Sequence, residues 1–214
     1  MGVVVIECDR VSAERTDELK RDGRSTGHEG TGPDATRRPS RERTGPVTDD
    51  EYQPVAVSRR ICAPAREIFQ ILANPVRHQQ LDGSGMLRGA VTTPMISGVG
   101  DVFVIKMYYS ELGDYEMNNH VVEYEPDRRI SWEPEAGRGH RDAAPSSEAG
   151  ARWGHRWTYQ LTPDGQDATI VTEIYDCSRA PEEERLGMDN GNTWVESMTR
   201  TLERLDALCT GQTG

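Results

Sequence analysis

The stretch DNGNTWVESMTRTLERLDALC, residues 189–209, predicts the one long amphipathic helix around which the rest of the chain is organised. Its apolar side chains recur every three or four positions, and its charged side chains fall on the other side of the helical wheel. About 18 residues that rise 1.5 Å each span roughly 27 Å, which is long enough to cross a sheet of ordinary strands. The apolar stripe consists of Trp194, Met198, Leu202, Leu205 and Cys209.

Both ends of this helix carry signals in the sequence. Asn190 or Asn192 can cap the first turn, because a short polar side chain accepts hydrogen bonds from free backbone amides there. Glu196 can pair with Arg200 one helical turn later, and Gly211 follows the last apolar position as a helix-ending residue.

Composition favours one domain with one hydrophobic core. The chain has 214 residues, of which 35% are hydrophobic, enough for one core but sparse for two. Its formal net charge of −11 argues against nonspecific binding to nucleic acid or to anionic lipid, because both need a basic surface. No stretch approaches the ~18 consecutive apolar residues of a membrane span, and MGVVVIECDR at the start is too short for a signal peptide. We therefore expect a cytoplasmic protein that does not insert into membranes.

The cysteines and glycines do not form the motifs of metal or cofactor sites. Cys8, Cys62, Cys177 and Cys209 are widely separated, with no CxxC pair and no histidine at ligand spacing. The glycines occur as DGSG and GVG, without the GxGxxG or GK[ST] patterns that hold nucleotide phosphates. The sequence therefore predicts free thiols, no metal and no cofactor.

Residues 1–50 differ from the rest of the chain. Between Lys20 and Pro46 there is no Val, Ile, Leu, Met, Phe, Tyr or Trp, so this segment cannot bury enough apolar surface to offset the entropy of ordering it. We expect a disordered N-terminal extension, interpreted as dispensable rather than as a binding arm. Residues 1–6 can form a short strand, but no partner for it is evident.

The folded domain is predicted to span residues 51–210, with a short tail at 211–214. A strand at 55–61 leads directly into a short helix at 64–74, and a helical turn then runs into the glycine-rich corner DGSG, residues 82–85. Further strands are predicted over 86–94, 99–109, 112–134 (two strands joined by a turn at Pro126, Asp127 and Arg128), 152–162 and 167–178.

The clearest alternation lies in RWGHRWTYQLT, residues 152–162, after a long loop at 136–151. One face of this strand is aromatic and the other is polar. The last strand, at 167–178, has two competing faces. If the face with Glu173 and Tyr175 points inward, a carboxyl group and a phenol enter the core. The aromatic face of the first strand consists of Trp153, His155, Trp157, Tyr159 and Leu161.

Taken in order, these elements predict an α+β fold. Helices and strands are segregated rather than alternating, and about six to seven antiparallel strands accompany the long C-terminal helix. The simplest packing wraps a strongly curved sheet around that helix, with two short helices after the first strand. A sheet curled around one helix leaves a space between them.

Several segments together carry a family resemblance. They are ICAPAREIFQILANPVRHQQLDGSG, VGDVF, VVEYEPDRRISWEP, WTYQLTPDGQDATIVTEIYD and the closing helix. Over residues 53–210 the chain resembles a bacterial polyketide cyclase/dehydrase-like protein of the SRPBCC (START-like, helix-grip) superfamily. The resemblance implies the helix-grip fold and a cavity under the C-terminal helix. It does not imply a reaction, because this superfamily houses cyclases, hydroxylase ligand domains, lipid carriers and hormone receptors on one scaffold.

Aromatic side chains are the strongest functional feature of the sequence. The chain has only four Trp and two Phe, and their concentration near one hairpin and in the closing helix favours a pocket for a hydrophobic small molecule. The competing interpretation is that these side chains fill the core and leave no cavity. The predicted ligand-binding residues are Phe103, Met107, Tyr109, Trp132, Trp153, His155, Trp157, Tyr159, Glu173, Tyr175, Trp194 and Met198.

His155 is the candidate for chemistry on the aromatic face. A neutral imidazole there can act as a general base on a polarised ketide or donate a hydrogen bond to a bound carbonyl. Glu173 or Tyr175 can orient it if their strand faces inward, and Glu173 or Tyr159 can serve as its acid/base partner. A structural role for His155 is the competing interpretation. The other histidines interpreted as structural or exposed are His78 and His120.

The sequence leaves two main function classes open. The first is a binding protein, monomer or homodimer, whose partner is a lipid, an aromatic compound or a polyketide-like molecule and not a nucleic acid. The alternative is an enzyme, an aromatase/cyclase or dehydratase that uses His155 as acid/base on a polyketide-like substrate. A third class, a toxin-like or protein-interaction member, rests only on the acidic net charge.

Overall fold

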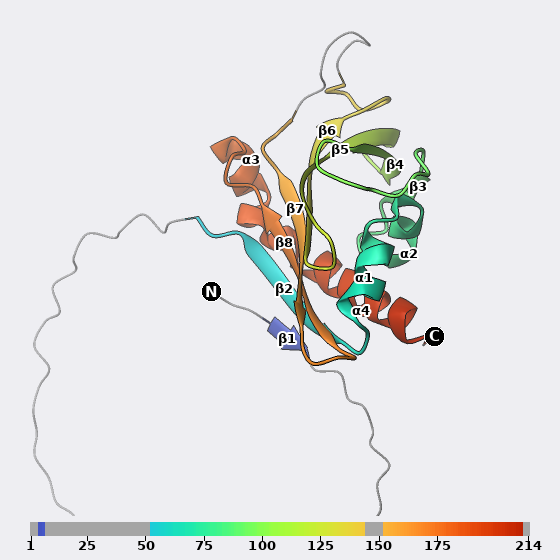
Figure 1. Cartoon of the computed structure of the whole chain (residues 1–214). Helices are drawn as coiled ribbons and strands as arrows, with labels where there is room; N and C mark the ends of the chain where they lie inside the picture. The colour runs from blue at the N-terminus through green and yellow to red at the C-terminus, as the bar shows by residue number, and fades with distance from the viewer. Residues whose placement is uncertain (1–3, 7–51, 144–151, 212–214) are drawn as a thin grey trace, which may run out of the picture. The chain divides into compact units, whose positions relative to one another are not determined.

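Seven antiparallel strands form one sheet in the computed structural model, which describes residues 4–6, 52–143 and 152–211. The strands run in the order β2-β8-β7-β6-β5-β4-β3, so that the chain from β3 to β8 moves across the sheet strand by strand (Figure 1). The predicted α+β fold is confirmed. The strands are β2 (Val55–Ile61), β3 (Leu87–Ala90), β4 (Val102–Tyr109), β5 (Gly113–Glu125), β6 (Arg129–Ala136), β7 (Arg156–Pro163) and β8 (Thr169–Asp176).

A further strand, β1 (Val4–Ile6), pairs in parallel with β2. It provides the partner that the sequence of residues 1–6 does not reveal. The rest of the predicted disordered extension lies outside the described residues, and so do residues 144–151 of the long loop and residues 212–214 of the tail.

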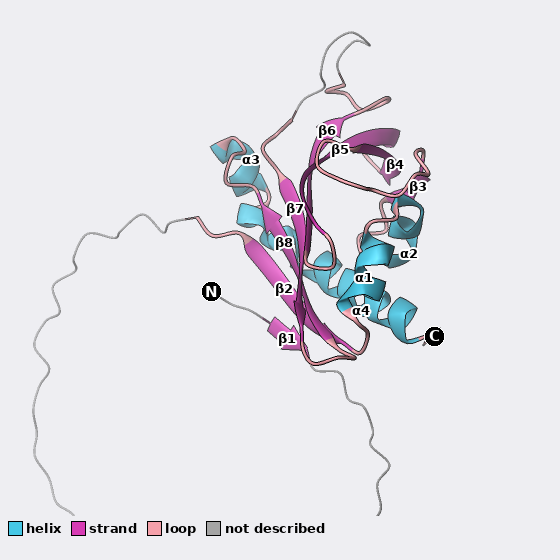
Figure 2. Cartoon of the chain, viewed as in Figure 1, coloured by secondary structure: helices cyan, strands magenta, loops and turns pink. Residues whose placement is uncertain are grey.

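Helices α1, α2 and α4 pack on one face of the sheet (Figure 2). Of the two short helices expected after the first strand, one is α1 and the other is α2, which follows the 3-10 turn η1 directly. The buried side of α1 consists of Ile68, Phe69 and Leu72. The helices are α1 (Ala65–Leu72), α2 (His78–Leu81), α3 (Glu182–Gly187) and α4 (Val195–Thr210), with 3-10 turns η1 (Pro75–Arg77) and η2 (Asp189–Trp194).

The long helix begins later than predicted. α4 starts at Val195 because Asn190 (φ 51°) and Gly191 (φ 94°) adopt left-handed backbone conformations, which interrupt a right-handed helix. A Cβ atom on Gly191 would lie 2.8 Å from Tyr175 Cδ1, so the chain passes this ring closely only with glycine there. The predicted asparagine caps are wrong, since Trp194 occupies the N-cap position and no side chain caps the helix.

The remaining helix signals are confirmed, and they place α4 against the DGSG corner. Glu196 pairs with Arg200, and Gly211 ends the helix with a φ of 70°. In the corner, the Gly83 amide donates to Thr201 Oγ1 at 3.0 Å. A Cβ atom on Gly83 would lie 2.0 Å from a backbone oxygen of α4, so backbone meets backbone at this contact.

The inner face of the sheet is apolar apart from a few polar groups. The competing faces of the last strand are resolved in the structure: Val171, Glu173 and Tyr175 of β8 are buried, whereas Ile170 and Ile174 are half-buried. A carboxyl group and a phenol therefore do enter the core. The fully buried apolar side chains of the core include Val57, Ile61, Ile68, Leu72, Ile130, Leu202 and Leu205.

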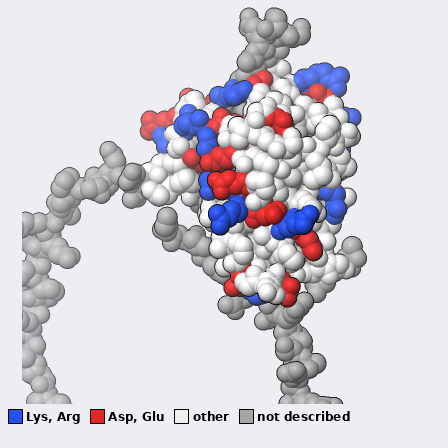
Figure 3. Space-filling model, viewed as in Figure 1, with Lys and Arg blue, Asp and Glu red and all other residues white. Residues whose placement is uncertain are grey.

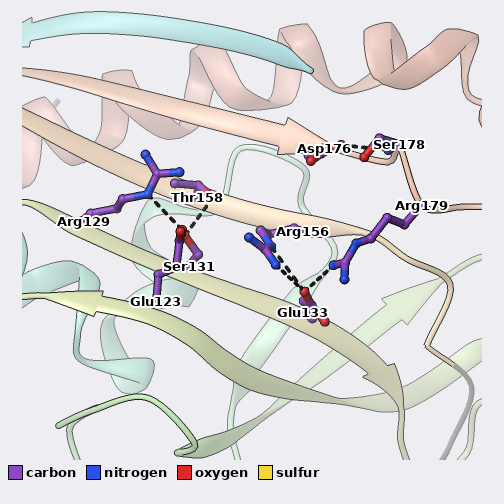
Figure 4. Close-up of polar contacts among 9 residues, drawn as sticks. All are labelled: Glu123, Arg129, Ser131, Glu133, Arg156, Thr158, Asp176, Ser178 and Arg179. Carbon is purple, nitrogen blue, oxygen red and sulfur yellow. Dashed lines mark hydrogen bonds and ion pairs between the residues drawn. The ribbon is translucent and has the colours of Figure 1, made fainter. Parts of the chain in front are cut away.

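Ion pairs cover the outer face of the sheet (Figure 4). Glu133 accepts from both Arg156 and Arg179, and Glu123 Oε2 accepts from Arg129 Nε at 2.9 Å. Acidic and basic side chains also lie beside one another on the face drawn in Figure 3, so that face carries no large area of one sign. The net charge of −11 is thus not concentrated there.

Candidate ligand-binding cavity

A cavity of about 300 Å³ lies between α4, α2 and the inner face of the sheet. This volume is at the lower end of the range for small-molecule sites. All four tryptophans of the chain line the cavity, although they come from β6, β7, η2 and the segment that precedes β7. The predicted binding residues that line it are Phe103, Met107, Trp132, Trp153, His155, Trp157, Tyr159, Glu173, Tyr175, Trp194 and Met198.

Tyr109 is the predicted binding residue that does not line this cavity. It is the last residue of β4 and is 42% exposed. Strand alternation puts it on the same face as the inward-pointing residues of β4, but the end of the strand lies beyond the part of the sheet that is covered. Tyr109 instead lines a separate depression with Met86, Thr193 and Trp194. Met86 and Trp194 also line the main cavity, so the depression adjoins it.

Tyr159 and Glu173 form the most deeply buried polar pair of the lining. They lie directly opposite each other on β7 and β8, and Tyr159 Oη donates to Glu173 Oε1 at 2.9 Å. Glu173 Oε2 has no hydrogen-bond partner within the described part of the chain. Burial raises the pKa of Glu173 to about 8, against the hydrogen bond from Tyr159, and the charge of Asp82 adds to the rise. The carboxyl group is therefore mostly protonated at neutral pH.

His155 forms a second polar pair. Its Nδ1 atom is 2.7 Å from Tyr175 Oη, and its Nε2 atom is 3.7 Å from Glu184 Oε2 of α3. Burial lowers the pKa of His155, against the charge of Glu184, so the imidazole is neutral at neutral pH. Burial also raises the pKa of Tyr175 above its usual value. Of the predicted partners of His155, Tyr175 contacts it, whereas Glu173 and Tyr159 bind each other.

Aromatic rings contact one another around the cavity. Trp132 is stacked on His78 with ring centroids 5.5 Å apart. Trp157 lies 4.5 Å from Tyr175 and 5.7 Å from Trp194, again between centroids. Because each ring is held by its neighbours, these contacts fix the orientation of the walls.

Further polar residues line the cavity without having been predicted to do so, namely His78, Asp82, Ser84, Tyr115, Asn119, His140, Ser197 and Thr201. His78 is structural as predicted, since its Nε2 atom is 2.8 Å from Leu72 O and burial lowers its pKa, but its ring also faces the cavity. Asn119 shares the inward face of β5, and Asp82 begins the DGSG corner. Strand alternation and the corner motif are signals in the sequence from which both positions could have been found. His120 does not line the cavity.

The lining carries two carboxyl groups but, within the described ranges, no lysine or arginine. The carboxyl groups belong to Asp82 and Glu173. The described part of the chain contains no group of three or more His, Cys, Asp or Glu side chains that could hold a metal ion. Within the same ranges, no helix is both long enough and apolar enough to cross a membrane.

We compared the chain with protein-family models and with curated proteins. No protein-family model matches the chain. The uncharacterized protein Rv0088 of Mycobacterium tuberculosis H37Rv is 33% identical over 132 residues, which are 61% of this chain and 51% of that protein. The uncharacterized protein MT0096 of strain CDC 1551 matches to the same extent. The chain therefore spans about half the length of the curated relatives it matches.

Solved bacterial structures have the same fold. Protein Ms6760 from Mycobacterium smegmatis has a TM-score of 0.54 at 16% identity, over 77% of this chain and 96% of that chain. Protein NE0264 from Nitrosomonas europaea has a TM-score of 0.55 at 16% identity, over 77% and 98% of the two chains. A protein from Arthrobacter aurescens has a TM-score of 0.55 at 17% identity, over 77% and 90%. At such identities the likeness concerns the fold alone.

Proposed function

We propose that this chain is a helix-grip protein of the START-like (SRPBCC) superfamily that binds a hydrophobic small molecule between α4 and the sheet. The observation that carries the proposal is the cavity of about 300 Å³ whose walls contain all four tryptophans. Apolar walls with a few placed polar groups are typical of small-molecule sites. The likeness to the solved bacterial structures supports the fold. A lipid, an aromatic compound or a polyketide-like molecule fits the lining.

Calorimetric titration of the full chain with 1-ethylnaphthalene, a neutral hydrocarbon of two rings, tests this function. We expect saturable binding with a negative heat-capacity change, because apolar surface is buried. Trp194→Ala should weaken binding by roughly tenfold, since it removes part of the wall. Leu205→Ala is the control: Leu205 is fully buried but does not line the cavity, so it should cost about 2–5 kcal/mol of stability and leave the affinity unchanged. Absence of saturable heat with the wild type, for this hydrocarbon and for probes of the same shape that carry a polar group, would refute the proposal.

A second candidate function is catalysis on a polyketide-like substrate, as in an aromatase/cyclase or dehydratase. It is favoured by the 2.7 Å contact between His155 Nδ1 and Tyr175 Oη within the lining. A neutral imidazole beside a phenol can exchange a proton with a bound substrate. Conversion of a poly-β-keto thioester by the wild type but not by His155→Ala would support this candidate. Binding of the thioester without conversion would contradict it.

A further inference from the structure

The charges around the cavity limit the class of ligand. Asp82 and Glu173 line it, and in the described ranges no lysine or arginine does. Within the described part of the chain, a ligand carboxylate or phosphate would therefore meet these two carboxyl groups and no lysine or arginine, at a cost that increases in surroundings of low polarity. Anionic ligands are disfavoured inside the cavity.

Both carboxylate oxygens of Asp82 accept hydrogen bonds from the DGSG corner and the residues that follow it. Its Oδ1 atom accepts from the Ser84 amide at 2.9 Å and from Ser84 Oγ at 2.6 Å. Its Oδ2 atom accepts from the Leu87 amide at 3.0 Å. These bonds hold the DGSG corner against β3, so the function of Asp82 is to shape the wall.

Glu173, in contrast, is occupied at one oxygen only. Tyr159 Oη donates to Oε1, and Oε2 has no partner among the described residues. Since Oε1 accepts the tyrosine proton, the proton of the neutral carboxyl group resides on Oε2, where it is a donor. A buried donor that lacks an acceptor is costly, and a ligand that brings the acceptor relieves this cost.

The histidines and tyrosines of the lining do not change charge in the pH range in which Glu173 titrates. Burial lowers the pKa of each histidine that lines the cavity and raises the pKa of each tyrosine. These side chains therefore stay neutral between about pH 7 and 9. Opposite Glu173, β2 presents Val57, and the α4 residues that line the cavity carry no ionisable group. The titratable residues concerned are His78, His140, His155, Tyr115, Tyr159 and Tyr175.

We propose that the ligand is neutral and carries an acceptor oxygen, such as a ketone, which accepts a hydrogen bond from Glu173 Oε2. This inference rests on the proposed binding function and names the ligand class for the same cavity. Tyr159 positions the carboxyl group, and the aromatic walls contact the remainder of the ligand. A protonated amine is the competing class, because aromatic faces and a carboxylate also suit a cation.

Naphthalenes of nearly the same shape separate these classes in calorimetric titrations of the full chain. The probes are 1-acetonaphthone (neutral acceptor), 1-ethylnaphthalene (no acceptor), 1-(1-naphthyl)ethylamine (cation) and 1-naphthoate (anion). At about pH 7 the ketone should bind roughly tenfold more tightly than the hydrocarbon, and the anion should bind most weakly. Above the pKa of Glu173, about 8, the affinity for the ketone should fall by up to about tenfold per pH unit. The affinity for the hydrocarbon should not fall with it.

Glu173→Gln isolates the group responsible. The glutamine amide keeps a donor at the position of Oε2 and an acceptor for Tyr159, but it does not titrate. The variant should retain the preference for the ketone and lose its pH dependence. Glu196→Gln is the matched control, because it removes a carboxylate from a side chain that is 82% exposed on α4. It should keep the wild-type pH profile.

The outcomes separate this inference from the function on which it rests. Equal affinity for ketone and hydrocarbon would overturn the inference and leave the binding function standing, whereas no binding of any probe would reject both. Tightest binding of the amine, lost in Glu173→Gln, would overturn the inference in favour of a cationic ligand. Should Glu173→Gln fail to fold, the wild-type pH profiles for ketone and hydrocarbon decide between these outcomes alone.

Discussion

Among single residues, Glu173 connects the cavity to the stability of the fold. Its pKa is raised to about 8 in the folded protein, from 4.5 for an exposed glutamate. The folded state therefore holds the proton more tightly than the unfolded chain does. It follows that the contribution of Glu173 to the free energy of unfolding is full below about pH 4.5 and is lost as the pH rises to about 8.

Glu173→Gln should remove this loss. We expect the variant to gain stability relative to the wild type by about 1.4 kcal/mol for each pH unit between about pH 5 and 8. Urea unfolding of both proteins across this range measures the difference. Taking the difference cancels groups common to both, such as buried His78, whose lowered pKa instead costs stability as the pH falls. A difference that does not change with pH would mean that Glu173 is ionised in the folded state.

Residue-scale prediction from the sequence reaches the lining but not the pairs within it. Strand alternation is enough to point Trp157 and Tyr159 inward. The partners depend on the register between β7 and β8, which sets Tyr159 opposite Glu173 and leaves His155 to Tyr175. Register is a property of two strands together, and neither strand's own pattern contains it.

Among the elements, α4 combines two surfaces along its length. Ser197, Met198 and Thr201 line the cavity, whereas Leu202 and Leu205 belong to the core. Apolar periodicity predicts this helix well. It places the start too early, because Trp194 fits the spacing of the apolar stripe although it belongs to η2. The left-handed residues Asn190 and Gly191 interrupt the helix, and apolar spacing contains no sign of them.

The contact between the DGSG corner and α4 predicts an effect of substituting Gly83. In Gly83→Ala the new Cβ would lie 2.0 Å from Ser197 O and 2.6 Å from Thr201 N, which are backbone atoms that cannot rotate away. The corner must then move off the helix, so we expect a loss of about 1–3 kcal/mol in the free energy of unfolding. Urea unfolding measures it. Gly98→Ala is the control, since a Cβ there meets nothing within 4 Å. Equal effects of the two substitutions would show that the contact is not tight.

At the scale of the whole molecule, the fold was predictable because few folds fit this order of elements. Segregated strands and helices, short turns and one long amphipathic helix leave little choice other than a curved antiparallel sheet on that helix. The place of β1 was not predictable. Three residues carry too short a pattern to specify a parallel pairing with a strand so distant in sequence.

Deletion of residues 1–51, which removes β1 from the edge of the sheet, tests how far ligand binding in the cavity depends on that strand. Among the described residues, none before Leu72 lines the cavity, so the affinity for 1-acetonaphthone should stay within about twofold of that of the full chain. Loss of the β1 pairing should lower the free energy of unfolding by on the order of 1 kcal/mol. Calorimetry and urea unfolding give the two quantities. A tenfold loss of affinity would assign the deleted segment a part in the site.

The placement of every tryptophan in the cavity wall has a spectroscopic consequence. Indole emission depends on the polarity and the quenchers around each ring, so the tryptophan fluorescence of this protein originates entirely from the walls of one cavity. Entry of a ligand should change that emission without any label. Circular dichroism in the far ultraviolet, which follows the backbone of the sheet and helices, then reports folding, so occupancy and folding have separate optical signals in the same sample.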